Sequence, residues 1–191
     1  MDHPTAQTIR KLTLAPLLAA VMLIFLYAVQ PEIFGSSWTL LLLQLNFLSL
    51  FPLLAYPIQP LVPTFRDKGR DGQRYLAMIF AFIGYLLDCL WNLCIRTSQE
   101  LCLIGWVYFL SGILVLLLNR LCGLRASGHA AGISAVVCLL TALGHPETLF
   151  VTLPLLCLVC WASMATKRHT FKQFIAGMLI PMVLTALLAA L

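Results

Sequence analysis

Two histidines stand where polar connectors meet long apolar runs, each close to cations. His129 lies in Arg125-Ala-Ser-Gly-His, and His169 lies in Thr166-Lys-Arg-His-Thr170. An imidazole titrates near neutral pH, so it can give or take a proton or attack an electrophile. Ser127, before an apolar run, is a typical helix N-cap, and the free N–H groups of a helix start bind anions. These residues therefore predict histidine chemistry on a bound anion.

The composition places this chemistry in a membrane protein. Of the 191 residues, 61% are hydrophobic and 10% are charged, and the mean hydropathy is +0.96. A membrane-spanning helix needs roughly 20 mostly apolar residues. We therefore expect an all-α polytopic helical bundle with about six to seven transmembrane helices, and no nucleic-acid partner. The apolar runs cover residues 12–29, 38–57, 75–95, 101–119, 130–144, 147–165 and 172–191.

Two of these assignments have alternatives. The run 12–29 follows two cations, as a signal peptide does, but it exceeds the roughly 7 to 15 apolar residues of a signal core and is interpreted as a span. The run 130–144 is short, and with 147–165 it forms either two spans or a re-entrant hairpin. The longest polar stretch, Thr64 to Arg74, is too short to fold alone. A single membrane-embedded domain over residues 1–191 is therefore expected.

If all seven runs cross the membrane, the connectors alternate between its two faces. The face that carries His129 also carries His169, because the 40 residues between them match one helix out and one back. Cytoplasmic loops are enriched in Lys and Arg, so we expect this face to be cytoplasmic. Eleven of the twelve Lys and Arg residues fall there: Arg10, Lys11, Arg66, Lys68, Arg70, Arg74, Arg120, Arg125, Lys167, Arg168 and Lys172.

A basic loop before the third run adds phosphate-binding side chains to the same face. It reads Phe65-Arg-Asp-Lys-Gly-Arg-Asp-Gly-Gln-Arg-Tyr75, and Arg74 lies at the mouth of the span. Guanidinium groups bind phosphate oxygens well. Taken singly, each of the three elements also has a structural interpretation: a helix cap with an interfacial histidine, a basic connector, and a solvated loop.

Together, these segments resemble the type 2 phosphatidic acid phosphatase superfamily of integral membrane lipid phosphate phosphatases, and in particular a branch common in bacterial genomes. Ser127, Gly128 and His129 match its Ser-Gly-His element, and His169 matches the histidine of its third motif. Arg74 matches the arginine that ends the first motif, with Lys68 or Arg66 as its lysine partner. The order and spacing of the motifs extend the resemblance over about residues 55–185.

Two positions depart from the family pattern. Gln173 stands where the family has an aspartate, and Ser163 stands where it has a phosphate-binding arginine. Arg168 or Lys167 could replace that arginine. The resemblance implies that His169 attacks phosphorus and forms a phosphohistidine, that His129 protonates the leaving group and then activates water, and that Gln173 orients His169. The implied phosphate ligands are Arg74, Lys68, Arg66, Arg168 and the backbone amides of Ser127 and Gly128.

The implied protein is a lipid phosphate or pyrophosphate phosphatase of the bacterial inner membrane, with a lipid phosphate as substrate, membrane lipids around it, and no metal or cofactor. Ser163 and Gln173 favour an alternative, a non-enzymatic or weakly active relative that keeps the bundle and the anion pocket. Both histidines favour the enzyme. A small transporter lacks support, because no pair of discontinuous helices is predicted. Asp88 and Asn92, inside the third run, are interpreted as packing groups or as a partner for Arg96.

Overall fold

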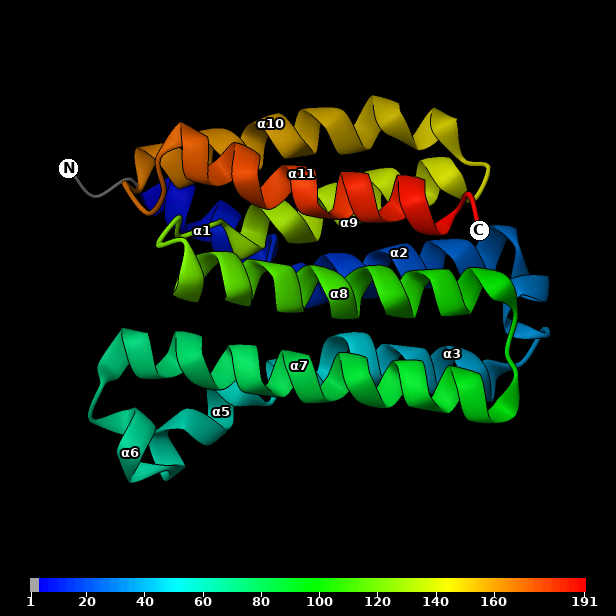
Figure 1. Cartoon of the computed structure of the whole chain (residues 1–191), viewed down its shortest axis with the longest axis horizontal. Coiled ribbons are helices and arrows are strands. Elements are labelled where there is room, and N and C mark those ends of the chain that lie inside the picture. Colours follow the sequence, from blue (N-terminus) through cyan, green and yellow to red (C-terminus); the bar gives the residue numbers. More distant parts are fainter. Residues whose placement is uncertain (1–3) are drawn as a thin grey trace. The chain divides into compact units, whose positions relative to one another are not determined.

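The computed structural model describes residues 4–191, and over this range the chain is all-α, as predicted (Figure 1). The short turns are η1 (Pro31–Phe34), the π-helical η2 (Asn46–Leu50), η3 (Gln59–Leu61) and η4 (Pro146–Thr148). The α-helices are α1 (Pro4–Leu12), α2 (Ala15–Val29), α3 (Trp38–Leu45), α4 (Phe51–Leu53), α5 (Ala55–Ile58), α6 (Pro63–Arg66), α7 (Gly69–Ile95), α8 (Gln99–Leu121), α9 (Gly128–Ala142), α10 (Leu149–Ala165) and α11 (Phe171–Leu188).

Five of these segments, or six if a bent pair is counted as one span, are long and apolar enough to cross a membrane. The pair α1 and α2 counts as a sixth span only if its bend of 50° is included. Helix α9 has 15 residues, so it is only about 22 Å long, against a hydrocarbon core of about 30 Å. The structure therefore agrees with the lower figure of the expected six to seven spans when the bent pair is counted, and it does not support the case in which all seven apolar runs cross. The five are Trp38–Leu61, Asp71–Ile95, Gln99–Leu121, Pro146–Ala165 and Phe171–Leu188.

The chain divides into two compact units, whereas the sequence predicts one bundle over residues 1–191. The first unit, called here the histidine unit, contains residues 4–18 and 110–191 and includes His129 and His169. The second, called here the aspartate unit, contains residues 19–109 and includes Asp88. The two boundaries fall inside α2 and α8.

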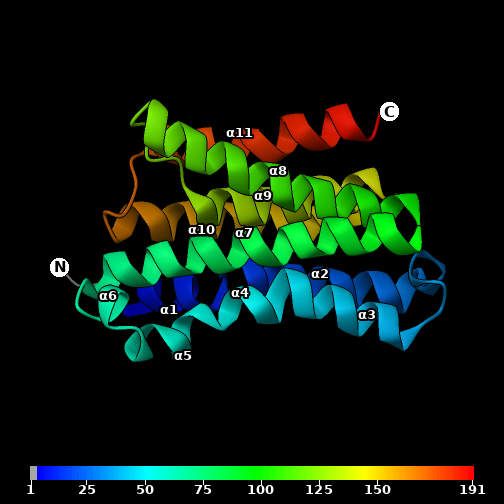
Figure 2. The same cartoon turned by 60° about the horizontal axis from the view of Figure 1, so that its bottom comes forward.

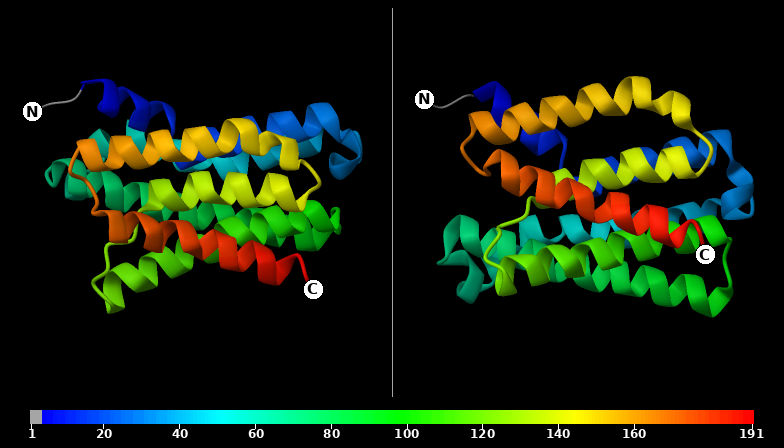
Figure 3. Two further views of the ribbon diagram at one scale, coloured as in Figure 1. Left: turned by 90° about the horizontal axis from the view of Figure 1, so that it is seen from above. Right: turned by 45° about the horizontal axis from the view of Figure 1, so that its top comes forward.

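Helix α9 is the centre of the histidine unit. It lies between α10 and α11 (Figure 3), and α1 packs on α10. Small residues allow these close approaches: a Cβ on Gly132 would lie 2.4 Å from the Cβ of Ala15. The hydroxyl of Ser134 donates to the Met178 carbonyl of α11 at 2.8 Å. Helices α9 and α11 both begin at the end of the histidine unit where α10 ends (Figure 3).

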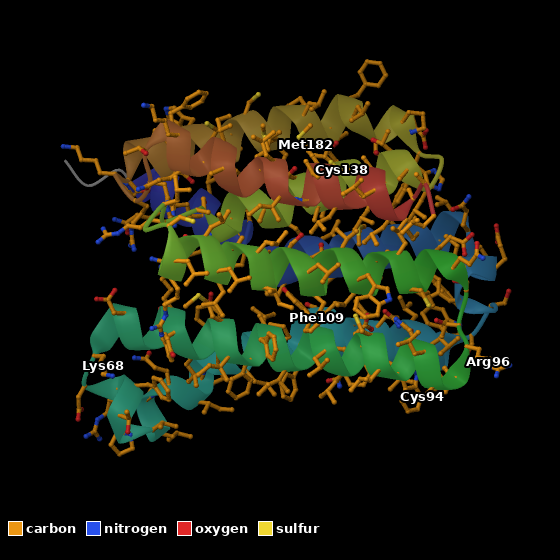
Figure 4. All side chains as sticks on the ribbon, viewed as in Figure 1. Lys68, Cys94, Arg96, Phe109, Cys138 and Met182 are labelled. Atoms are coloured by element: carbon orange, nitrogen blue, oxygen red, sulfur yellow. The ribbon has the colours of Figure 1, made fainter. Side chains whose placement is uncertain are left out.

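In the aspartate unit, the segments α3 to α6 follow one another along α7 (Figure 2). The basic loop is folded rather than extended, because the Gln59 side-chain amide donates to the carbonyls of Phe65 at 3.1 Å and Gly69 at 2.8 Å. Lys68 and Arg96 flank opposite ends of α7 (Figure 4). The basic loop and Arg96 are thus separated by the length of one spanning helix.

Gly177 of α11 lies directly against the backbone of Ser127. A Cβ at this position would lie 2.3 Å from the carbonyl oxygen of Ser127 and 2.9 Å from its nitrogen. No side chain could turn aside to relieve such a contact, since both atoms are backbone.

We predict that Gly177→Ala destabilises the protein. Overpacking typically costs about 1–3 kcal/mol, and an immovable backbone partner places the cost at the upper end, above the roughly 1 kcal/mol gained in helix propensity. Thermal unfolding in detergent measures the difference. Leu179→Ala, at an exposed position of the same helix, is the control and should change the unfolding temperature little. Equal unfolding temperatures for Gly177→Ala and wild type would contradict the close approach.

Candidate active site

Ser127 caps α9, as the sequence predicts. Its backbone is extended, and its hydroxyl oxygen accepts from the N–H of Ala130 at 3.3 Å. The residue is completely buried. Its own N–H donates to the carbonyl of Gln173 at 3.0 Å. The Ser127 amide is thus engaged in joining α9 to α11, instead of being turned toward a phosphate as predicted.

Gly128, the first residue of α9, is placed so that its main-chain amide can bind an anion, as predicted. It is exposed, and no atom lies within 4 Å of where its Cβ would be. At a helix start, the N–H groups of the first residues have no acceptor within the helix. The main chain of Gly128 and His129 therefore offers anion-binding donors beside open space.

The His129 ring connects α9 to α1. Its Nε2 lies 3.0 Å from the main-chain carbonyl of Arg10. A carbonyl only accepts hydrogen bonds, so Nε2 carries the hydrogen and the lone pair of the neutral ring is on Nδ1. The bond also satisfies a carbonyl in the last turn of α1, where helix carbonyls lose their partners.

Electrostatics keep this ring neutral. Burial, reinforced by the cationic side chain of Arg10, lowers the pKa of His129 to about 4, although the bond to the Arg10 carbonyl opposes the shift. The nearby His169 lowers it further. At neutral pH, His129 is therefore in the form that accepts a proton.

The segment between α10 and α11 places His169 by two capping motifs in succession. Lys167 adopts a left-handed conformation, with a φ of 51°. The N–H of Arg168 donates to the Ser163 carbonyl at 3.2 Å, and that of Lys167 to the Met164 carbonyl at 2.9 Å. These bonds form a Schellman motif that ends α10. Thr170 then caps α11, so that His169 stands directly before the new helix.

The orientation of His169 is set by a group that the sequence did not indicate. Its Nδ1 lies 3.1 Å from the carbonyl of Arg125, so Nδ1 carries the hydrogen and Nε2 the lone pair of the neutral ring. Arg125 itself has a left-handed backbone, with a φ of 50°. The connector before α9 therefore holds the histidine that precedes α11.

Gln173 has a different role from the predicted one. Its side-chain oxygen accepts from the N–H of Thr170 at 3.1 Å, and its own N–H donates to the Thr170 hydroxyl at 3.4 Å. This reciprocal pair is a capping box. Gln173 therefore acts on the start of α11, and the Arg125 carbonyl is the acceptor found at His169. This corrects the prediction that Gln173 orients the ring.

Arg10 is the residue that the sequence analysis missed. Its guanidinium Nη1 lies 3.5 Å from the hydroxyl of Ser163, in the last turn of α10, and 3.4 Å from that of Thr166, the C-cap residue of this helix. It brings a cation to position 163, where the sequence suggested Arg168 or Lys167 as a replacement. From the sequence, Arg10 is interpreted only as an indicator of membrane topology, because 153 positions separate it from Ser163. The small side chain at position 163 is the one hint of a distant partner.

The other predicted phosphate ligands are exposed side chains. The Arg168 side chain is exposed at the end of α10. Arg66, Lys68 and Arg74 belong to the aspartate unit and are exposed, and Arg66 pairs with Asp67 at 3.0 Å. Exposed pairs of this kind contribute little to stability. The site built from the histidine unit alone contains His129, His169, Arg10, Ser163 and the start of α9.

Comparison with protein-family models, with curated proteins and with solved structures finds no match for this chain. Within residues 4–191, no group of three or more His, Cys, Asp or Glu side chains is arranged to hold a metal ion.

We predict that Arg10→Gln raises the pKa of His129 from about 4, since it removes a positive charge near the ring and leaves the main-chain bond in place. The pKa should stay below the usual 6.5 or so, because burial is the larger cause. Titration of isotope-labelled histidines by NMR in detergent measures it, with Lys11→Gln as the neighbouring control. An unchanged pKa would contradict the proximity of the Arg10 charge.

The wild type should lose stability as pH falls from about 6.5 to about 4, where only the unfolded ring gains a proton.

Proposed function

We propose that the protein is a membrane lipid phosphate or pyrophosphate phosphatase that acts through a phosphohistidine intermediate. The observation that carries the proposal is the meeting of His129, His169 and the Arg10 guanidinium at one end of the histidine unit. The resemblance to the type 2 phosphatidic acid phosphatase superfamily, based on Ser127-Gly-His129 and His169, supports the same reaction.

In the proposed reaction, Nε2 of His169 attacks phosphorus while the bond from phosphorus to the lipid oxygen breaks. The Arg125 carbonyl favours the tautomer in which Nε2 has the lone pair, so the nucleophilic nitrogen needs no prior proton loss. Arg10 and the N–H groups at the start of α9 bind the nonbridging oxygens. Phosphoryl transfer depends chiefly on such positioning and charge stabilisation.

His129 acts as the general acid and then as the general base. A phosphate dianion offsets the charge of Arg10 and favours the imidazolium form, so substrate binding prepares the ring to protonate the leaving oxygen. The neutral ring then takes a proton from the water that attacks the phosphohistidine and releases phosphate. Because Nε2 is bound to the Arg10 carbonyl, we assign these transfers to Nδ1.

A second candidate function is a non-enzymatic relative that binds an anion at this end of the bundle. Two observations favour it: Gln173 is committed to capping α11, and the Ser127 amide is committed to Gln173. Gln173, at the position where the family has an aspartate, therefore supplies no carboxylate charge to a charged His169. The activity assay distinguishes the two functions.

We predict that the purified protein releases phosphate from one or more of phosphatidic acid, phosphatidylglycerophosphate, prenyl pyrophosphates and a lipid A phosphate. His169→Ala should reduce this to background, and His129→Ala should reduce it by about 10²–10⁴-fold, the usual contribution of an acid–base group. His145→Ala, at the other end of α9, is the matched control.

Activity that survives both substitutions would exclude the mechanism, and a wild type inert on every substrate would favour the binding protein.

The excess of cations on the histidine face leads us to propose cytoplasmic access in a bacterial inner membrane. Turnover by intact cells but not by inverted vesicles would contradict this orientation.

We also predict that Arg10→Ala lowers turnover by about 10²–10³-fold, the typical effect of losing one charge-stabilising donor. The main-chain bond to His129 remains, so the loss reports the guanidinium. Lys11→Ala, an exposed neighbour, is the control and should have little effect. The double variant Arg10→Ala with Ser163→Arg should recover part of the activity, since it returns a guanidinium to the same end of α10. Full activity in Arg10→Ala would exclude this role.

A further inference from the structure

A carboxyl group, that of Asp88, is buried inside a long apolar helix of the aspartate unit. Asp88 and Gln44 are fully buried, and Asn92 is 1% exposed. Asp88 makes no ion pair among the residues that the structure describes, and Arg96 is exposed beyond the end of α7. The interpretation of Asp88 as a partner of Arg96 is therefore not supported.

Side-chain amides surround this carboxyl group. The Asn92 amide donates to Asp88 Oδ2 at 3.1 Å and to the Leu101 carbonyl at 3.4 Å, and the Gln44 amide donates to Asn92 Oδ1 at 2.7 Å. The Gln44 side chain also reaches the Asp88 carboxyl group. Helices α3, α7 and α8 thus meet at one polar cluster.

Helix α8 is shaped to accept this cluster. A Cβ on Gly105 would lie 2.5 Å from Asp88 Oδ2 and 3.4 Å from Asn92 Nδ2. The absence of a side chain at Gly105 therefore lets the carboxyl group sit directly against the backbone of α8.

Two oxygen atoms of the cluster have no hydrogen-bond donor. They are Asp88 Oδ1 and Gln44 Oε1, and both are buried. An ionised carboxylate is costly to bury in a membrane without a cation. A single hydrogen on Asp88 Oδ1 removes the charge and creates a donor, and Gln44 Oε1 is an acceptor that lacks one.

The surroundings favour a proton over a metal cation. Hard metal ions take about six oxygen ligands, whereas the Asn92 and Gln44 amides already direct N–H groups into the cluster. The titratable neighbours of Asp88 are Cys89 on α7 and Cys102 on α8. Tyr85, one turn before Asp88 on α7, adjoins Tyr56 and contacts Tyr108 of α8. None of these carries a positive charge, and α3 contributes only Gln44.

We propose that Asp88, Asn92 and Gln44 form a proton-binding site within the membrane-embedded part of the aspartate unit, with the proton on Asp88 Oδ1 and donated to Gln44 Oε1. The site is independent of the phosphatase proposal. Because the cluster joins α3, α7 and α8, release of the proton requires these helices to part and admit water.

Infrared spectroscopy of the reconstituted protein at neutral pH, in sodium-free buffer, tests the site. The carbonyl stretch of a protonated carboxylic acid should be present in wild type, absent in the isosteric Asp88→Asn, and retained in Asp67→Asn, which alters an exposed carboxylate. Gln44→Met removes the acceptor and should shift the band to higher frequency without abolishing it.

Three outcomes would overturn the proposal: no acid band in folded wild type, a band that persists in Asp88→Asn, or a band that sodium ions abolish, which would identify a cation site instead. If Asp88→Asn does not fold, an unshifted band in Gln44→Met still contradicts the assigned hydrogen bond.

Discussion

The candidate site depends on one backbone contact, the approach of Ser127 to α11. Its N–H binds the Gln173 carbonyl at 3.0 Å, and Gly177 leaves no Cβ between the two segments. This contact fixes the start of α9 against the start of α11, so the histidines that flank these helix starts face a common region. The adjoining Arg125 carbonyl then orients His169. A larger residue at 177 would separate two helix starts as well as two helices.

Main-chain carbonyls accept a hydrogen bond from one ring nitrogen of each of the two histidines. The acceptor is Arg10 for His129 and Arg125 for His169, and different ring nitrogens donate in the two cases. The rings therefore present different nitrogens for chemistry. A neutral acceptor stabilises an imidazolium less than a carboxylate does. In the proposed reaction, the negative charge of the bound phosphate must therefore balance the histidine charge, while Arg10 and the helix start stabilise the phosphate oxygens.

Local patterns in the sequence predicted the helical class, the cap at Ser127 and the joint position of the two histidines at one end. They failed where distant segments decide the outcome. Arg10 reaches Ser163 across 153 positions, and the bend between α1 and α2 and the short α9 depend on packing that no apolar run reveals. Gln173 was assigned from a family pattern, yet its own spacing from Thr170 already contained a capping box. The sequence indicated Asp88 and Asn92 of the buried cluster as packing groups, but it did not indicate Gln44, which joins them from another helix.

The most direct test of the central claim is to trap the phosphohistidine. Purified protein is mixed with phosphate-labelled lipid substrate, quenched at alkaline pH, where phosphohistidine survives, and digested for mass spectrometry. The proposed mechanism predicts a phosphoryl group on His169 in wild type, more of it in His129→Ala because hydrolysis of the intermediate slows, and none in His169→Ala. Turnover without any covalent phosphate on His169 in either wild type or His129→Ala would contradict it.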